Sequence, residues 1–469
     1  MILLAHSYYL ANDPKQRSRM KPYPPLATLL AAALLRRHGH EVALFDAMLA
    51  PGPDAFGAAL RDTRPRVVGL LEDNFNYVTK MCTVRMREAA LGMIAAAREH
   101  GCRVAVNGSD AADRPALYLE AGAHAVIRGE AEPGMLDLAE RWRDAPGSAA
   151  PPLDAIPGLV LPDGAGGATF TAARPALRDL DTLPLPAWDL VDVEAYRRAW
   201  TAAHGRFSWN MVTSRGCPFG CNWCAKPLFG RRYAQRSPQG VADEMRRLRD
   251  EVRPDHLWFA DDIFGLTPRW VQAFARAVRE ADARIPFMMQ SRVDLMRPEV
   301  VAALAEAGAE EVWLGVESGS QRILDAMDKE TSVAGVRAAT RALRAAGVRA
   351  CWFLQLGYPT ETWDDLLRTR DLVRDERPDD IGVSVAYPLP GTKFHAAVRA
   401  QLGPRQNWEH TDDLAMLFRG TYGTGFYRRV RDVLHREVST GAADDAGWLA
   451  LARDERAHRS ERPSLPATH

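Results

Sequence analysis

The sequence predicts an α/β protein with two successive arrays of alternating strands and helices, followed by a small, mostly helical C-terminal segment. Short apolar runs recur along residues 1–145 and again along 205–396, and amphipathic stretches of helical periodicity separate them. This alternation indicates parallel sheets. We expect the first array to be a doubly wound, Rossmann-like sheet and the second to be a partial (β/α)6 barrel.

The composition is that of an ordinary globular chain of 469 residues, 47% hydrophobic and 26% charged, with a formal net charge of zero. The balanced charge shows no excess of basic residues that would attract nucleic acid, so we expect no nucleic-acid partner. The longest apolar stretch, Leu26 to Leu35, is too short to cross a bilayer, and no signal peptide is recognisable. We therefore expect a cytoplasmic protein without a membrane partner.

Residues 1–145 carry five predicted strands, which begin at Ile2, Glu41, Arg66, Cys102 and His124. Helices are expected over 25–37 and 79–100. Doubly wound sheets bind ligands beyond the carboxyl ends of their strands, where this chain places the loops 6–24, 72–77, 107–110 and 128–130. No G-x-G-x-x-G follows the first strand, so a dinucleotide site is not expected.

Residues 146–204 are predicted to connect the two arrays. Gly158 to Leu161 and Ala168 to Thr171 flank a glycine-rich turn, which predicts a hairpin. Pro184 and Pro186 favour an extended strap over residues 179–193.

Residues 205–396 give six repeats of a strand followed by a helix. The expected strands start at Trp209, Leu257, Phe287, Val312, Ala350 and Ile381. Ser237-Pro238, Thr267-Pro268 and Arg297-Pro298 are typical helix starts. In such barrels the site lies at the carboxyl ends of the strands.

Residues 397–469 form the predicted C-terminal segment. Trp408, Phe418, Tyr422, Phe426 and Tyr427 are close together, and a helix is expected over 427–438. These aromatic side chains could cover the substrate or only close the bottom of the barrel, and both interpretations stay open. Residues 453–469 are expected to be disordered.

Three cysteines at C-x3-C-x2-C spacing lie in the stretch Cys217-Pro-Phe-Gly-Cys221-Asn-Trp-Cys224, directly after the first barrel strand. Thiolates are soft ligands that suit zinc or an iron–sulfur cluster. A closed zinc site takes four ligands, and no histidine or further cysteine lies nearby. We expect a cluster with one open iron; a zinc site with a remote fourth ligand is the alternative. The scattered Cys82, Cys102 and Cys351 are expected to pack in the core.

Polar residues follow the other barrel strands, at 261–262, 290–294, 317–319, 355–361 and 387–392. One polar strand end alone is usually a helix cap, an internal salt bridge or a solvated loop. Five such ends on the face that carries the cysteines indicate a binding site.

The stretch Ser214-Arg-Gly-Cys-Pro-Phe-Gly-Cys-Asn-Trp-Cys closely resembles the cluster loop of the radical S-adenosylmethionine (SAM) superfamily. The resemblance implies that Cys217, Cys221 and Cys224 hold a [4Fe-4S] cluster whose open iron binds SAM. The implied SAM-binding residues are Trp223, Asp261, Asp262, Ser291, Arg292, Glu317, Gln355 and Tyr358. Among these, the Asp261–Asp262 region would meet the amine, Arg292 and Glu317 the carboxylate or ribose, and the 355–358 segment the adenine.

Residues 1–145 resemble the cobalamin-binding domain that precedes some radical SAM domains. The similarity rests on Pro25-Leu26, Phe45-Asp46-Ala47, Asn107-Gly108-Ser109 and Arg128-Gly129-Glu130. The D-x-H-x-x-G motif that supplies a histidine to cobalt is absent, since Leu4 and Tyr9 flank His6 at the Asp and Gly places. The implied cobalamin-binding residues are Ser7, Tyr8, Glu72, Asn74, Asn76, Gly108, Ser109, Gly129 and Glu130. The alternative is that the 72–77 loop is only solvated and the glycines only form turns.

The resemblance implies a cobalamin-dependent radical SAM enzyme. Its expected reaction is methylation of an unactivated carbon of a small molecule, through a 5′-deoxyadenosyl radical and methylcobalamin. We also expect an electron donor such as flavodoxin or ferredoxin, and a monomer or weak oligomer. Three alternatives stay open: an oxidative cyclase or rearrangement enzyme, a radical enzyme with a vestigial N-terminal domain, and a non-catalytic iron–sulfur protein for electron transfer or redox sensing.

Overall fold

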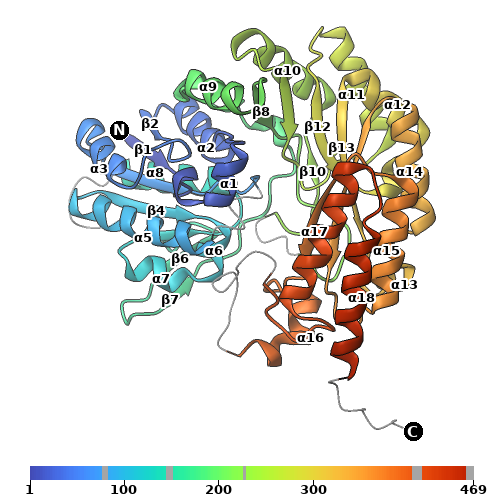
Figure 1. Ribbon diagram of the computed structural model, residues 1–469. Helices are drawn as coiled ribbons and strands as arrows, with labels where there is room; N and C mark the ends of the chain where they lie inside the picture. Colours follow the sequence, from blue (N-terminus) through green and yellow to red (C-terminus); the bar gives the residue numbers. More distant parts are fainter. Residues whose placement is uncertain (77–82, 144–151, 225–228, 404–414, 461–469) are drawn as a thin grey trace. The chain divides into compact units, whose positions relative to one another are not determined.

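The computed structural model describes residues 1–76, 83–143, 152–224, 229–403 and 415–460 (Figure 1). Contacts group the chain into two compact units. Unit 1 contains residues 1–218, 226–264 and 269–289, and unit 2 contains residues 219–225, 265–268 and 290–469. Each unit is described by itself. The four-part division 1–145, 146–204, 205–396 and 397–469 stays a prediction. Cys82, Tyr77 and Trp408 lie outside the described residues.

The first sheet of unit 1 has seven strands in the order β2-β1-β3-β4-β5-β6-β7. The first five strands are parallel neighbours, whereas β6 and β7 form the predicted hairpin and pair antiparallel at one edge. Their bounds are β1 Ile2–Ala5, β2 Val42–Phe45, β3 Val67–Leu71, β4 Arg103–Asn107, β5 Ala125–Ile127, β6 Leu159–Pro162 and β7 Ala168–Phe170. The connector therefore extends the sheet, which the sequence did not predict.

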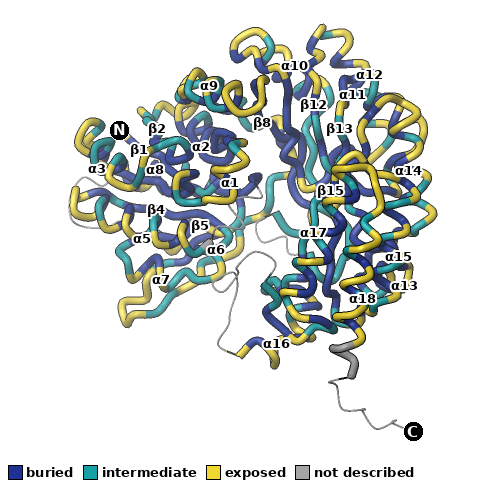
Figure 2. The backbone as a smooth tube through the Cα atoms, in the orientation of Figure 1, coloured by how far each residue is buried: buried dark blue, intermediate teal, exposed yellow. Residues whose placement is uncertain are grey.

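Helices cover both faces of this sheet because its strands are apolar on both sides. On one face α2 (Leu26–Arg37) and α8 (Ala131–Arg143) pack against side chains such as Leu4 and Val67. On the other, α3 (Asp54–Thr63), α5 (Thr83–Glu99), α6 (Ser109–Asp113) and α7 (Pro115–Glu120) pack against side chains such as Leu3 and Val68. The central strands β1, β3, β4 and β5 are largely buried, and Figure 2 shows exposed residues along α3, α5 and α7. The short α1 (Pro14–Arg19) and a 3-10 turn (Leu10–Asn12) lie in the loop after β1.

The second sheet has six strands in the order β15-β14-β13-β12-β11-β8, which follows the chain as expected of a partial (β/α)6 barrel. Its strands are β8 Ser208–Met211, β11 His256–Phe259, β12 Phe287–Ser291, β13 Ala309–Glu317, β14 Arg349–Leu356 and β15 Asp380–Val385. The pairs β8–β11 and β11–β12 in unit 1 and β13–β14 and β14–β15 in unit 2 are parallel. The predicted fold class is confirmed.

The barrel helices begin where the sequence places capping residues and prolines. Ser237 caps α10 by accepting from the Gly240 amide, and α12 ends at Gly308, whose φ of 109° is the left-handed conformation that glycine tolerates. These helices are α10 Pro238–Glu251, α11 Pro268–Glu280, α12 Pro298–Ala307, α13 Gln321–Ala326, α14 Val333–Ala345 and α15 Trp363–Glu376, and α9 Val193–His204 precedes β8. A 3-10 turn over Val293–Leu295 and the short antiparallel pair β9 (Ser214–Arg215) and β10 (Ala234–Gln235) complete the set.

Three elements differ in extent from the predictions. The strap contains 3-10 turns at Leu180–Thr182 and Trp188–Leu190, because Asp179 accepts a hydrogen bond from the Asp181 amide and closes the first of them. The described part of the C-terminal segment contains three helices: α16 Lys393–Leu402, α17 Thr424–Thr440 and α18 Asp445–Ser460. The expectation of disorder from residue 453 was wrong up to Ser460, since α18 buries Trp448 and Leu451.

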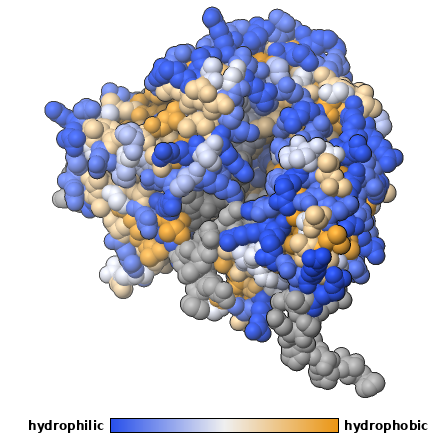
Figure 3. Space-filling view, viewed as in Figure 1, coloured by the Kyte–Doolittle hydropathy of each residue, from blue (hydrophilic) through white to orange (hydrophobic). Residues whose placement is uncertain are grey.

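Hydrophilic side chains predominate on the face in Figure 3, with scattered apolar patches. Among the described residues, no helix combines the length and the apolar character that crossing a bilayer would require.

We predict that Gly319→Ala destabilises unit 2. A Cβ at Gly319 would lie 2.4 Å from the Arg368 carbonyl oxygen and 2.6 Å from the Thr369 Cα, both of which are backbone atoms of α15. Overpacking of this kind costs about 1–3 kcal/mol, and thermal unfolding should report a lower midpoint. Gly52→Ala is the control, because a Cβ there meets nothing within 4 Å. Equal midpoints for the two variants would contradict the prediction.

Candidate functional site

The cysteine loop, residues 217–224, follows β9. Its three cysteines are half-buried, and none of them forms a disulfide. Among the described residues, no group of three His, Cys, Asp or Glu side chains is arranged around a metal position. The donor set itself fits a cluster, because three thiols on one short loop stay accessible and a guanidinium nitrogen of Arg292 lies 3.8 Å from the Cys221 sulfur. The division between the units falls after Pro218, so Cys217 is described with unit 1 and the other two with unit 2.

Asn222 anchors the part of the loop that belongs to unit 2. Its amide donates to the Met327 carbonyl at 3.0 Å, and its side chain donates to the Ala326 carbonyl at 2.8 Å. The Tyr358 hydroxyl is 3.1 Å from the Asn222 side-chain oxygen and 2.7 Å from the Ala326 carbonyl. The sequence placed Tyr358 beside adenine, which stays a prediction; the structure shows it bracing the loop between the second and third cysteines.

Glu317 ends β13 in an unusual backbone conformation, with φ of 64° and a shift of strand register at Gly315/Glu317. Its carboxylate pairs with Lys329 at 2.7 Å, and both side chains are buried. Burial alone would lower the pKa of Lys329, but the charges of Glu317 and Cys221 outweigh it and raise the pKa. Lys329 was not singled out from the sequence, where nothing distinguishes it from a surface lysine.

Two predicted SAM-binding residues carry buried polar atoms that lack a partner in the described part of unit 2. They are the Gln355 side-chain oxygen and the Trp223 indole N–H. Buried polar groups are normally hydrogen-bonded, so one unused acceptor and one unused donor fit a site that is completed by a ligand.

In unit 1 the Asp261 carboxylate holds the turn that leads into the cysteine loop. It accepts from the Thr213 amide at 3.1 Å, the Thr213 hydroxyl at 2.7 Å and the Ser214 hydroxyl at 2.5 Å. Burial raises the pKa of Asp261 to about 6 against these hydrogen bonds. Asp262 is exposed, whereas Ser291, which belongs to unit 2, is buried. Contact of either aspartate with the SAM amine stays a prediction.

The loops predicted to bind cobalamin meet at the carboxyl edge of the first sheet. The Ser7 hydroxyl donates to Glu72 at 2.6 Å, and the Asn74 side chain donates to that of Asn107 at 3.0 Å. Asn107 in turn donates to the Gly129 carbonyl at 3.0 Å. The ends of β1, β3, β4 and β5 are thereby joined in one network.

Further members of the predicted cobalamin set border this network. A Cβ at Gly108 would lie 2.8 Å from the Glu72 Cγ, so only glycine fits there without displacing that side chain. The Tyr8 hydroxyl donates to Asp13 at 3.2 Å, Asn76 is buried, and Ser109 begins α6. The structure brings these residues together, and their contact with cobalamin stays a prediction.

Glu130 has protein partners instead of facing outward. Its carboxylate accepts from Arg215 at 2.7 Å and from the Leu177 amide at 2.6 Å. Arg215 also donates to Glu132 at 2.6 Å, and all three charged side chains are buried. The guanidinium carbon lies 5.5 Å from the ring centroids of both Phe75 and Phe229. The sequence offered one signal for this link, since Arg215 stands two residues before Cys217.

The sequence did not predict the partners of His6, which is buried directly after β1. His6 contacts Asp46 at 2.9 Å, and the Tyr196 hydroxyl donates to the other Asp46 oxygen at 2.7 Å. Asp46 therefore ties α9 to the first sheet, which explains its place after β2 without a ligand.

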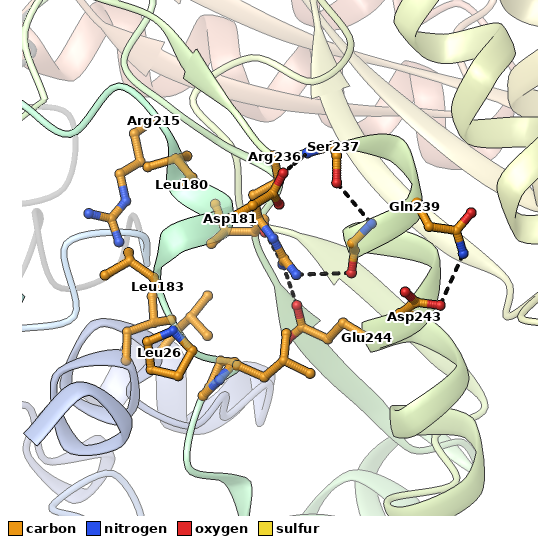
Figure 4. A pocket seen from close by; sticks show the side chains of 16 residues that line it. Leu26, Leu180, Asp181, Leu183, Arg215, Arg236, Ser237, Gln239, Asp243 and Glu244 are labelled. Carbon is orange, nitrogen blue, oxygen red and sulfur yellow. Dashed lines mark hydrogen bonds and ion pairs between the residues drawn. The ribbon is translucent and has the colours of Figure 1, made fainter. Parts of the chain in front are cut away.

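A pocket of about 450 Å³ in unit 1 lies between α2, the strap and the start of α10. Leu26, Leu30 and Leu183 form its apolar wall, and Figure 4 shows Arg236 reaching toward Glu244 on the polar wall. None of the residues predicted to bind a cofactor lines it.

Residues 211–373 match the family described as the Radical SAM superfamily. This stretch is a radical SAM domain, so the resemblance inferred from the cysteine loop is confirmed. An uncharacterized methyltransferase of Pyrococcus horikoshii is 28% identical over 286 residues, which are 61% of this chain and 60% of the relative. The anaerobic magnesium-protoporphyrin IX monomethyl ester cyclase of Cereibacter sphaeroides is 28% identical over 59% of this chain and 45% of the relative. The chain thus spans about half the length of these curated relatives.

The radical SAM methyltransferase TsrM of Kitasatospora setae, solved with cobalamin and a [4Fe-4S] cluster, has a similar fold. Its TM-score is 0.71 at 20% identity, and the match covers 86% of this chain and 78% of TsrM. Because this match covers more of the chain than residues 211–373, the similarity of fold also includes the N-terminal sheet.

We predict that Glu132→Ala strongly destabilises unit 1, because it leaves Arg215 buried with one carboxylate partner fewer. Breaking a buried ion pair costs about 3–5 kcal/mol. Chemical denaturation should show this loss, whereas Asp189→Ala, which breaks the exposed pair with Arg36, should cost less than about 1 kcal/mol. Similar losses of stability in both variants would show that the buried ion pairs of Arg215 with Glu130 and Glu132 are not formed as described.

We also predict that Glu361→Gln changes the pH dependence of stability. Glu361 is fully buried and accepts from the Gly357 amide at 2.7 Å, and burial raises its pKa from the ordinary 4.5 to about 8. Between these values the folded protein keeps a proton that the unfolded chain loses, so stability falls as pH rises through this range. The glutamine variant lacks this loss.

The advantage in unfolding midpoint of Glu361→Gln over the parent should therefore grow by about 4 °C between pH 5 and pH 8.5. The exposed Glu299→Gln variant should show no such trend. A pH-independent difference for Glu361→Gln would contradict the prediction.

Proposed function

We propose that this protein is a cobalamin-dependent radical SAM enzyme that methylates an unactivated carbon of a small molecule. The observation that carries the proposal is the radical SAM domain with its three accessible cysteines, joined in one chain to a doubly wound sheet whose loop network fits a ligand. Residues 1–145 would bind cobalamin and residues 205–396 the cluster and SAM. The chemistry that these groups supply when bound is reductive cleavage of SAM and delivery of a methyl group.

The protein's own residues supply position and enclosure. Cys217, Cys221 and Cys224 would hold the cluster. The unused polar atoms of Gln355 and Trp223 would pair with SAM, and Glu317 would contact its carboxylate or ribose. Ser7, Glu72, Asn74 and Gly108 would border the corrin. An electron donor such as flavodoxin or ferredoxin would reduce the cluster.

Methyl transfer is favoured because the P. horikoshii relative is named a methyltransferase, as is the solved TsrM. The second candidate is an oxidative cyclase, which the C. sphaeroides relative supports. The two differ in their products: a cyclase forms 5′-deoxyadenosine without a methylated product.

We predict that the anaerobically reconstituted protein retains cobalamin through desalting and forms 5′-deoxyadenosine when it receives dithionite and SAM. Cys224→Ala should abolish 5′-deoxyadenosine formation, because a missing thiolate leaves the cluster incompletely held. The control is Cys351→Ala, which alters a buried cysteine of β14 that lies outside the loop.

Absorption spectra before and after desalting measure the retained cobalamin, and chromatography measures the nucleoside. Nucleoside formation without retained cobalamin would exclude the methyl-transfer reaction. An intact cluster with neither property would exclude the enzyme proposal.

A further inference from the structure

Arg292 touches the cysteine loop at two places within unit 2. Its guanidinium carbon lies 3.7 Å from the centroid of the Phe219 ring, and Nη1 is 3.8 Å from the Cys221 sulfur. Arg292 is 6% exposed, so both contacts are shielded from water. A stacked cation and a cation–sulfur hydrogen bond are both stronger where water is excluded.

The rest of the guanidinium is committed to the protein. Nε donates to Asp294 at 2.9 Å, and Nη2 lies 2.8 Å from the Lys329 carbonyl and 3.4 Å from that of Glu330. With the bond to Cys221, these contacts engage four of the five N–H groups of an arginine. A bidentate fork onto a carboxylate needs two parallel N–H groups, and only one remains. This arrangement argues against Arg292 as a forked ligand of the SAM carboxylate.

A second buried cation lies in the same part of unit 2. Lys329 is 5% exposed, and its ammonium lies 6.0 Å from the centroid of the Trp223 ring. Its charge is offset by Glu317 at 2.7 Å. The charge of Arg292 has a weaker offset, since Asp294 is 38% exposed and therefore screened by solvent. Arg292 is thus the cation whose field acts most directly on the Cys221 sulfur.

We propose that Arg292 positions the cysteine loop and raises the reduction potential of the cluster by donating a charged hydrogen bond to Cys221. The inference rests on the proposed function, because it concerns the cluster that these cysteines would hold. One-electron reduction of a cluster held by these cysteines would increase the negative charge on its sulfur ligands. A buried cation beside one sulfur stabilises the reduced form more than the oxidised form.

The test is an EPR-monitored redox titration of the reconstituted full-length protein, with Arg292→Met and Arg292→Lys. At a fixed potential, Arg292→Met should lower the ratio of reduced to oxidised cluster about tenfold, which corresponds to 59 mV for one electron. Arg292→Lys should fall between the parent and the methionine variant, because it keeps the charge but loses the planar contact with Phe219.

Arg337→Met is the matched control, since it removes an arginine of unit 2 that pairs with Asp375 and Glu376 instead of the loop. Its cluster potential should equal that of the parent. Equilibrium binding of SAM to the oxidised protein provides the second readout, and Arg292→Met should change the affinity less than about threefold.

An unchanged potential in Arg292→Met would overturn the proposal. An unchanged potential together with a loss of SAM affinity greater than tenfold would make Arg292 a SAM ligand instead. If Arg292→Met loses iron while Arg337→Met retains it, the positioning role is supported, and Arg292→Lys then decides the electrostatic role. Failure of the parent protein to bind a cluster would refute the proposed function instead, so the two failures are distinguishable.

Discussion

The buried ion pairs of Arg215 with Glu130 and Glu132 join parts of unit 1 that lie 85 and 83 residues apart in the sequence. Three charges removed from water are tolerated only when each finds a partner at close range. That requirement fixes the end of β9, two residues before Cys217, against the segment that follows β5. The Leu177 amide, which also donates to Glu130, brings the connector to the same place. The start of the cysteine loop is thus set by the N-terminal sheet.

In unit 2 a buried arginine also contacts the part of the cysteine loop that belongs to this unit. Arg292 lies against Phe219, and Arg215 lies beside the stacked rings of Phe75 and Phe229, so a buried guanidinium contacts aromatic rings in each unit. The Asn222 hydrogen bonds hold the loop backbone, while Arg292 acts on the Cys221 side chain. A loop that must present thiolates in one arrangement benefits from such contacts, because a ligand set that is already ordered loses less entropy when it binds metal.

The carboxyl edge of the first sheet shows how a shared fold acquires a particular site. Parallel strands bring several loops together there in any doubly wound protein, and the side chains decide what they can bind. Here Ser7, Glu72, Asn74 and Asn107 are linked by hydrogen bonds, and Gly108 leaves the space that Glu72 fills. The hydrogen-bonded side chains at this edge are therefore stronger evidence for a ligand site than the strand order, which many doubly wound proteins share.

The sequence alone determined the two α/β arrays and the helix starts at Pro238 and Pro298, because each depends on local spacing or periodicity. The stretch around Cys217, Cys221 and Cys224 also sufficed for the resemblance to the radical SAM superfamily, which residues 211–373 match. Tertiary structure alone decided which charges meet. Nothing local distinguishes Lys329 from a surface lysine or pairs Glu130 with Arg215, since partners 85 residues apart are joined only by folding. The resemblance also assigned Arg292 to the SAM carboxylate or ribose, which stays a prediction. Only the fold shows that one of its hydrogen bonds reaches the Cys221 sulfur, while the others reach Asp294 and the carbonyls of Lys329 and Glu330. Helix α18 likewise extends past residue 453 because its apolar side chains pack in unit 2, a contact that local composition cannot reveal.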